Sequence, residues 1–134
     1  MDDYGRTPIF HSIVKGDMHS FKQEFAIIPD IDISDVNGMN LLFFACIYNQ
    51  LEMAELLIKN GIDIEKRDKY GNTPLWRATF ECKGSKYALV ELLVKHGANV
   101  YSLNNAGRSP LIFAQTVGDA RLITLLESSE ARQF

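Results

Sequence analysis

Residues 68–78 read DKYGNTPLWRA, and this pattern decides the fold. It returns as DDYGRTPIFHS at residues 2–12, DVNGMNLLFFA at 35–45 and NNAGRSPLIFA at 104–114. The shared glycines Gly5, Gly38, Gly71 and Gly107 are separated by 33, 33 and 36 residues. A period in the low thirties is typical of a solenoid, in which supersecondary units stack side by side. We therefore expect four stacked units that bind another molecule on a long surface.

Each unit carries signals for the start of a helix. Two residues after the glycine stands a side chain that can accept a hydrogen bond from a free N–H at a helix N-terminus: Thr7, Asn40, Thr73 or Ser109. In three units a proline follows, namely Pro8, Pro74 and Pro110. Proline suits the first helical position, where its missing N–H has no partner to lose. Asp or Asn first and Gly fourth, just before these signals, favours a type I turn.

A second helix is predicted later in each unit. Residues 51–61 read LEMAELLIKNG and residues 87–97 read YALVELLVKHG, with apolar residues at helical spacing. Gly61 and Gly97 can adopt the left-handed conformation that ends a helix. This register predicts that Leu57 and Leu93 face the core.

Residues 71–78 and 90–100 together resemble an ankyrin repeat. The resemblance implies an all-α ankyrin-repeat solenoid of four stacked helix-turn-helix units with short β-hairpin or turn tips. It would form one domain over residues 1–129, with repeats at about 2–34, 35–67, 68–103 and 104–129. Residues 130–134 would then be a polar tail.

The chain departs from the family pattern in three places. The family's histidine after Thr-Pro-Leu is replaced by Phe10, Phe43, Trp76 and Ile112, so we expect apolar packing there. Gln23 and Glu24 stand where the second unit has Leu56 and Leu57, and the last unit ends without a Gly, so we expect both terminal units to be caps. The third unit gains three residues around Lys83-Gly84-Ser85.

The resemblance implies a concave binding face made by the turn tips and the exposed ends of the first helices. Carried over position by position, the expected partner-binding residues are Tyr4, Arg6, Asn37, Met39, Ile47, Tyr48, Arg67, Lys69, Tyr70, Asn72, Phe80, Glu81 and Arg108. Tyr48 and Tyr70 lie in the middle units, where hot-spot residues would be most central. Two alternatives stay open. Ile47 and Phe80 could belong to the core between repeats, and the insertion near Lys83–Ser85 could be the main contact.

Composition excludes several function classes. The chain is 46% hydrophobic and 23% charged, with a pI of about 5.6, which disfavours direct binding to nucleic acid. The longest apolar run, residues 41–48, is shorter than the about 20 residues that span a bilayer. Cys46 and Cys82 do not suggest a disulfide framework. We expect a cytoplasmic protein, with no signal peptide and no membrane contact, that is monomeric when free.

Charge and chain ends lead to the specific functional hypothesis. Residues 1–67 carry a net charge of −5 and residues 68–134 a net charge of +2, so we expect a basic protein partner. The chain begins with Met and ends in a short polar stretch, as a complete protein would. Small stand-alone ankyrin proteins resemble bacterial immunity proteins, which bind and block a toxin. The alternative is an adaptor or scaffold subunit that joins two proteins.

Catalytic and metal chemistry find little support. His11 and Ser12 with nearby Asp17 contain the ingredients of a nucleophile–base pair, so a hydrolase is the remote alternative. Ser12 stands where the other units have a small Ala, which indicates packing. His11, Asp17 and His19 could be metal ligands, but no Cys or further His completes the set. We expect no cofactor, no metal and no enzymatic activity.

Overall fold

The computed structural model describes residues 3–130, and eight helices lie in this range. They are α1 (Pro8–Lys15), α2 (Met18–Phe25), α3 (Leu41–Ile47), α4 (Leu51–Lys59), α5 (Pro74–Cys82), α6 (Ala88–Lys95), α7 (Pro110–Val117) and α8 (Ala120–Glu130). Asp2 and residues 131–134 of the predicted tail lie outside the described residues. Glu130, which was assigned to that tail, is the last residue of α8.

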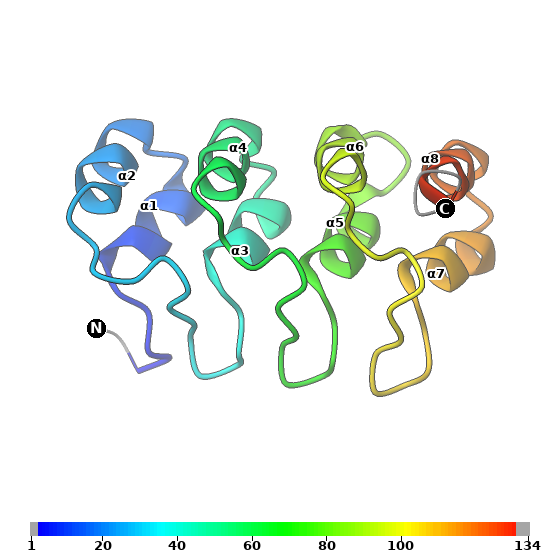
Figure 1. Ribbon diagram of the computed structural model, residues 1–134, viewed down its shortest axis with the longest axis horizontal. Helices are drawn as coiled ribbons and strands as arrows, with labels where there is room; N and C mark the ends of the chain where they lie inside the picture. The colour runs from blue at the N-terminus through cyan, green and yellow to red at the C-terminus, as the bar shows by residue number, and fades with distance from the viewer. Residues whose placement is uncertain (1–2, 131–134) are drawn as a thin grey trace.

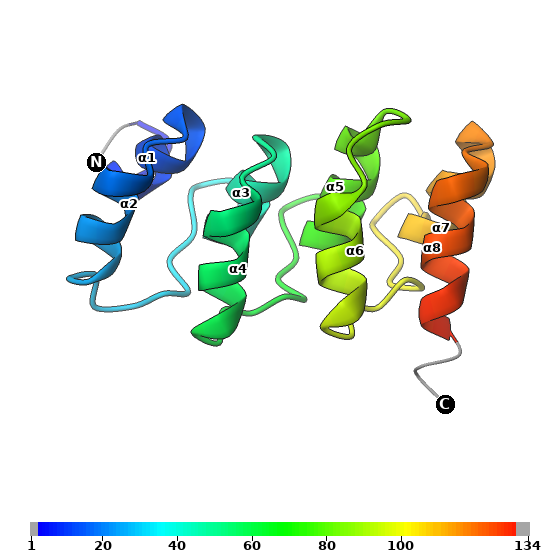
Figure 2. The ribbon, with the colours of Figure 1, turned by 90° about the horizontal axis from the view of Figure 1, so that it is seen from above.

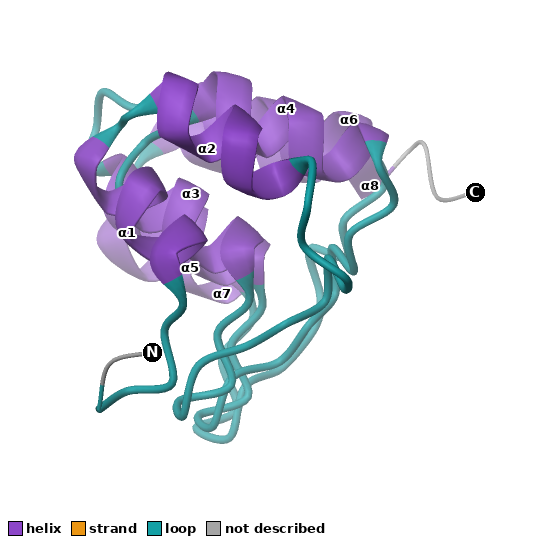
Figure 3. Ribbon diagram, turned by 90° about the vertical axis from the view of Figure 1, so that its left-hand side faces the viewer, coloured by secondary structure: helices purple, strands orange, loops and turns teal. Residues whose placement is uncertain are grey.

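The helices form two rows along the long axis of the molecule (Figures 1 and 2). The first helices α1, α3, α5 and α7 make one row, and the second helices α2, α4, α6 and α8 make the other. The connections between units project from the helices on one side as a row of tips (Figure 3). The predicted all-α stack of four helix-turn-helix units is confirmed.

The first helices begin where the sequence predicts. Pro8, Pro74 and Pro110 are the first residues of α1, α5 and α7. The side chains of Asn40, Thr73 and Ser109 accept hydrogen bonds from backbone N–H groups of the first turns, at 3.2, 3.3 and 3.1 Å. The prediction for Thr7 is wrong. The N–H of Phe10 donates instead to the Thr7 carbonyl at 3.1 Å, and the Thr7 hydroxyl is buried without a partner among the described residues.

The tips are turns held by one repeated side-chain device. Asp35 Oδ1 accepts the backbone N–H groups of Asn37 and Met39, each at 3.0 Å. Asp68 and Asn104 accept the corresponding pairs of N–H groups in the next two tips. Within residues 3–130 there is no regular strand, and Ser34 and Asn40 form an isolated bridge. Of the two forms predicted for the tips, β-hairpin or turn, the described residues show the turn.

Backbone hydrogen bonds also join each tip to the one before it. The N–H of Val36 donates to the Tyr4 carbonyl at 2.8 Å, and the N–H of Lys69 donates to the Asn37 carbonyl at 2.8 Å. The N–H of Asn105 donates to the Tyr70 carbonyl at 2.9 Å. The tips thus form a ladder that fixes the spacing of their exposed side chains.

The core runs through the whole stack. Leu57 and Leu93 are fully buried, as predicted. Phe10 and Phe43 are also fully buried, which confirms apolar packing at the level of the family's histidine in the first two repeats. In the last repeat the prediction is wrong, because Ile112 has no outer neighbour and is 38% exposed.

The first repeat has a polar pair at two positions that are apolar and buried in the second repeat. Glu24 lies in register with Leu57, and Ser12 lies in register with Ala45. The Ser12 hydroxyl donates to the Glu24 carboxylate at 2.6 Å. The positions of two buried core residues of the second repeat, Ala45 and Leu57, thus carry a hydrogen-bonded Ser–Glu pair between α1 and α2 in the first repeat.

Candidate functional site

The concave face is the surface bordered by the tips and by the exposed ends of α1, α3, α5 and α7 (Figure 3). Eleven large apolar or aromatic side chains are exposed among the described residues. Seven of them lie at the family's variable positions on this face: Tyr4, Val14, Val36, Tyr48, Tyr70, Phe80 and Val117. Large exposed apolar side chains thus recur at the positions that the family resemblance assigns to one binding face, whereas single exposed apolar residues are common on any protein surface.

The two central tyrosines are accessible. Tyr70 is 59% exposed at the tip of the third repeat, with the Lys69 ammonium 5.1 Å from its ring centre. Tyr48 is 44% exposed at the end of α3, and its ring centre lies 6.3 Å from that of Phe44. Ile47 beside it is half-buried. Both tyrosines thus have a large exposed fraction that a partner can contact.

An aromatic cluster extends the face toward the last repeat. The ring of Trp76 stacks on Phe80 with centres 5.6 Å apart, and Phe113 lies 5.5 Å from Trp76 and 5.8 Å from Phe80. The sequence analysis missed Trp76 and Phe113 as parts of this site. The spacing of four residues between Trp76 and Phe80 was an available signal. The contact with Phe113 becomes visible only when α5 and α7 are stacked.

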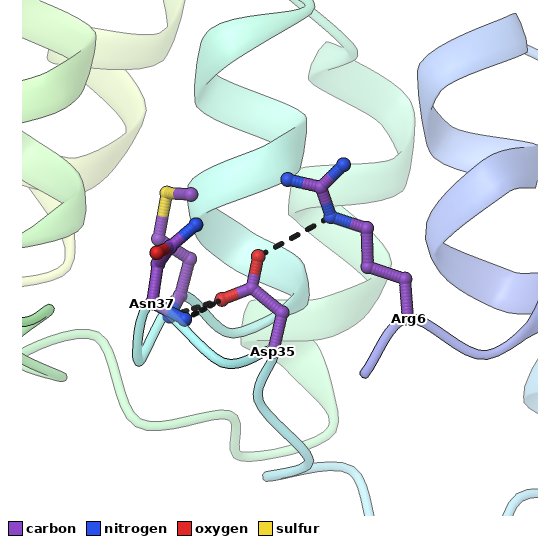
Figure 4. A network of polar contacts seen from close by, with 4 residues as sticks. Arg6, Asp35 and Asn37 are labelled. Atoms are coloured by element: carbon purple, nitrogen blue, oxygen red, sulfur yellow. Dashed lines mark hydrogen bonds and ion pairs between the residues drawn. The ribbon is translucent and has the colours of Figure 1, made fainter. Parts of the chain in front are cut away.

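Arg6 is engaged within the molecule (Figure 4). Its Nε donates to Asp35 Oδ2 at 3.3 Å, and the Asp35 side chain is fully buried. The guanidinium also lies 4.8 Å from the ring centre of Tyr4 and 4.9 Å from that of Phe44. Arg6 therefore links the first repeat to the second through an ion pair with Asp35 and a cation–π contact with Phe44.

Other predicted contact residues also hold neighbouring repeats together. Arg67 donates to the Ser102 hydroxyl at 3.0 Å and to the Leu103 carbonyl at 2.7 Å. The Asn72 side chain accepts a hydrogen bond from Asn104 Nδ2 at 2.8 Å. Glu81 is instead engaged within its own repeat, where it forms an ion pair with Arg77 of the same helix α5 at 2.9 Å.

The remaining predicted contact residues lie on or beside the tips. Lys69 and Arg108 are exposed, and Asn37 and Met39 are half-buried. Met39 also packs against the core. That any of the predicted residues touches a partner stays a prediction.

The residues considered for catalysis have structural roles. Asp17 caps α2, where Oδ1 accepts the Ser20 N–H at 3.1 Å and Oδ2 accepts the Ser20 hydroxyl at 2.7 Å. These hydrogen bonds hold the pKa of Asp17 below its usual value. Ser12 is committed to Glu24, and His19 is exposed on α2. No three His, Cys, Asp or Glu side chains within residues 3–130 are grouped to hold a metal ion.

The two cysteines are free and buried, Cys46 on α3 and Cys82 on α5. Burial raises the pKa of both thiols, so neither is an activated nucleophile. In the described part of the chain, no helix combines the length and the apolar character needed to cross a bilayer.

Comparison with known proteins gives two matches. A family model described as "Ankyrin repeats (3 copies)" matches residues 15–104, which is more than half of the chain. A protein of Caenorhabditis elegans named "Putative glutaminase 2" is 28% identical over 74 residues, or 54% of this chain. The matched segment spans 12% of the glutaminase, so the likeness concerns a small part of that protein.

Proposed function

We propose a function from the premise that this chain belongs to the ankyrin-repeat family, whose repeats are protein–protein interaction modules. In this proposal the chain binds a protein partner on its concave face and catalyses no reaction. The supporting observation is the concentration of exposed Tyr, Phe and Val side chains on that face. Aromatic residues are enriched among the few interface residues that supply most of the binding free energy.

The specific role we propose is inhibition of a toxin, as in a bacterial immunity protein. The partner would be basic, because the first half of the chain carries a net charge of −5. Exposed carboxylates of that half, such as Asp30, Asp63, Glu52 and Glu55, lie on outer loops and on α4 and not at the tips. They would therefore steer a basic partner at a distance through the summed field. The two free cysteines support a reducing, cytoplasmic location.

The test of concave-face binding is the double variant Tyr48→Ala/Tyr70→Ala. A partner is first recovered from the native cell by affinity capture and identified by mass spectrometry, and its affinity is then measured by calorimetric titration. We expect the double variant to lose at least about tenfold in affinity for each tyrosine, because truncating a hot-spot residue costs about 2 kcal/mol or more.

The melting temperature of the free variant should stay close to that of the wild type. The matched control is Tyr101→Ala, which removes a tyrosine of similar exposure from the loop after α6. Equal affinity of the double variant and the wild type would disprove the concave-face proposal.

A growth assay separates the toxin inhibitor from the adaptor. If the partner is a toxin, its expression alone stops growth, and co-expression of this chain restores growth. An adaptor would instead bind two proteins at once, with each lost through a different set of substitutions. A partner that is harmless when expressed alone would overturn the immunity role.

A further inference from the structure

The three-residue insertion of the third repeat builds an ordered turn, which we call the inserted turn (residues 83–86). Lys83 and Gly84 both adopt left-handed backbone conformations, with φ of 49° and 78°. The N–H groups of Ser85 and Lys86 donate to the Cys82 carbonyl at 3.1 and 3.0 Å. The turn leans from α5 and α6 toward α7 and α8 (Figures 1 and 2). The inserted turn is therefore an ordered, hydrogen-bonded element of the surface beside the last repeat.

Two hollows flank the inserted turn. The apolar hollow, of about 460 Å³, is lined mainly by Thr79, Phe80, Phe113, Val117 and Leu122. The polar hollow, of about 270 Å³, lies on the other side and includes Tyr48, Asn49, Glu81 and Lys86. Lys83 lines both hollows. Ligand pockets in proteins measure about 300–1,000 Å³, so the apolar hollow can accept an apolar side chain.

The polar hollow is lined by two exposed lysines, and within residues 3–130 Lys86 has no ion pair and Lys83 has a long one. Among the described residues, the side chain of Lys86 has neither an ion-pair nor a hydrogen-bond partner. Lys83 Nζ lies 3.9 Å from Glu81, but this lysine side chain is 70% exposed and Glu81 is already paired with Arg77 at 2.9 Å. An exposed ion pair of this kind contributes little. Two lysines thus remain available to an external anion.

The anionic group at the apolar hollow is already committed. The Asp119 carboxylate accepts the Tyr87 hydroxyl at 3.1 and 3.0 Å and caps α8 through the Leu122 N–H at 3.1 Å. It is therefore a weak competitor for the lysines. Lys83 and Lys86 at the inserted turn therefore favour an acidic ligand, in contrast to the acidic outer loops of the first two repeats.

We propose that the inserted turn is a docking site for a partner segment in which an apolar residue stands next to Asp or Glu. The apolar side chain enters the apolar hollow beside Phe80 and Val117. The carboxylate crosses the turn and pairs with Lys86 and Lys83. This inference rests on the proposed function, because it assumes a protein partner, and it assigns that partner a short acidic and apolar segment.

The test uses a random peptide library displayed on phage and selected on the intact chain. Selected peptides without tryptophan are synthesised and titrated by intrinsic fluorescence. Trp76 is the only tryptophan of the chain, and it lies 5.6 and 5.5 Å from Phe80 and Phe113. Its emission therefore reports occupation of the apolar hollow. We expect the selected peptides to share an apolar residue beside Asp or Glu and to shift this emission to saturation.

Matched variants locate the site. Val117→Ser removes a side chain that is 55% exposed, and Lys86→Glu reverses a charge, so neither should alter the fold. Each should weaken peptide binding at least ~tenfold, which is about 1.4 kcal/mol. Lys86→Glu should regain binding to a peptide whose acidic residue is replaced by Lys. Ile27→Ser and Lys22→Glu, at exposed positions of the first repeat at the other end of the stack, are the controls and should bind as the wild type does.

Several outcomes overturn the inference: no enriched peptide, peptides without the acidic and apolar pair, or binding that is unaffected by Val117→Ser and Lys86→Glu. Such a result leaves the concave-face proposal standing if the native partner still depends on Tyr48 and Tyr70. Conversely, peptides that bind at the inserted turn, together with a native partner indifferent to both tyrosines, would disprove only the concave-face proposal.

Discussion

At the scale of single residues, Asp35 has two roles, and its counterparts in the next two tips have one of them. Asp68 and Asn104 accept the two backbone N–H groups of their tips, and so does Asp35. Asp35 alone of the three is also seen to pair with an arginine, Arg6, at 3.3 Å. The turn could be predicted from Asp first and Gly fourth. The pairing with Arg6, 29 residues away, could not, because it depends on how closely two repeats stack.

Substitutions at Asp35 should separate these roles. Asp35→Asn keeps the side-chain oxygen that accepts the two tip hydrogen bonds, and Asn104 shows that an Asn oxygen can hold a tip in this way. It loses the negative charge that pairs with Arg6. Asp35→Ala loses both, and we expect it to lower the free energy of unfolding by about 3 kcal/mol or more, because the partly buried ion pair with Arg6 is broken and the N–H groups of Asn37 and Met39 also lose their acceptor. Asp35→Asn should cost clearly less. Urea denaturation measures both variants, and equal losses would mean that the tip hydrogen bonds contribute nothing.

At the scale of helices and tips, local signals predicted starts and ends well. Pro8, Pro74 and Pro110 begin helices, and Gly61 and Gly97 end them with φ of 85°. The local predictions that were wrong depend on contacts between parts of the chain that local sequence signals do not describe. Thr7 has the side chain of a cap, but the first-turn N–H already has a backbone partner. The contacts of the candidate site residues within the molecule could not be predicted either, since Arg6 and Arg67 bind neighbouring repeats and Trp76 joins Phe113 across two helices.

The second helices should be sensitive to truncation at their inner leucines. Leu57→Ala and Leu93→Ala each remove a fully buried side chain, and a buried Leu→Ala change costs roughly 2–5 kcal/mol. Leu103→Ala is the matched control, because Leu103 is exposed in the loop before α7. Denaturation midpoints should fall for both buried positions and stay near the wild type for Leu103→Ala. Unchanged midpoints at the buried positions would refute the assigned core register.

The polar pair between α1 and α2 should be convertible to the apolar pair of the inner repeats. Ser12→Ala combined with Glu24→Leu restores the Ala and Leu of the second repeat, and a compatible core substitution of this kind adds about 0.5–2 kcal/mol. Glu24→Leu alone should gain less, since the Ser12 hydroxyl then keeps only the Pro8 carbonyl at 3.4 Å. Melting curves of the three proteins would test this. A less stable double variant would show that the first repeat is packed differently from the second.

At the scale of the whole molecule, charge is divided along the stack. The first half carries −5 and the second half +2, and this division could be counted directly in the sequence. The places of these charged side chains on the surface could not be read from the sequence. The acidic side chains of the first two repeats lie mainly on outer loops and α4, away from the tips, while Lys83 and Lys86 border the hollows of the third repeat. The long-range field and the contact surface are therefore separate features of the molecule.

Association with a basic partner should therefore slow as salt is added. Charges separated by more than the Debye length, about 8 Å at physiological ionic strength, are largely screened. The association rate from stopped-flow mixing should fall with ionic strength, whereas dissociation should change little. Glu52→Gln/Glu55→Gln, at exposed positions of α4, should reduce this salt dependence without altering the fold. A rate independent of salt would remove the argument for a basic partner.

The hydrogen-bond ladder between tips has a mechanical consequence. Each rung runs in the same sense, from the N–H of one tip to the carbonyl of the tip before it. Pulled from its two ends, the molecule should act as springs in series, with the rungs parting one at a time. The first repeat, whose Ser12–Glu24 pair stands where the second repeat has buried apolar residues, should yield at the lowest force. When tension is released, the second repeat, if still folded, offers the free N–H of Val36 to the Tyr4 carbonyl of the first repeat, so refolding should proceed by addition to an existing edge.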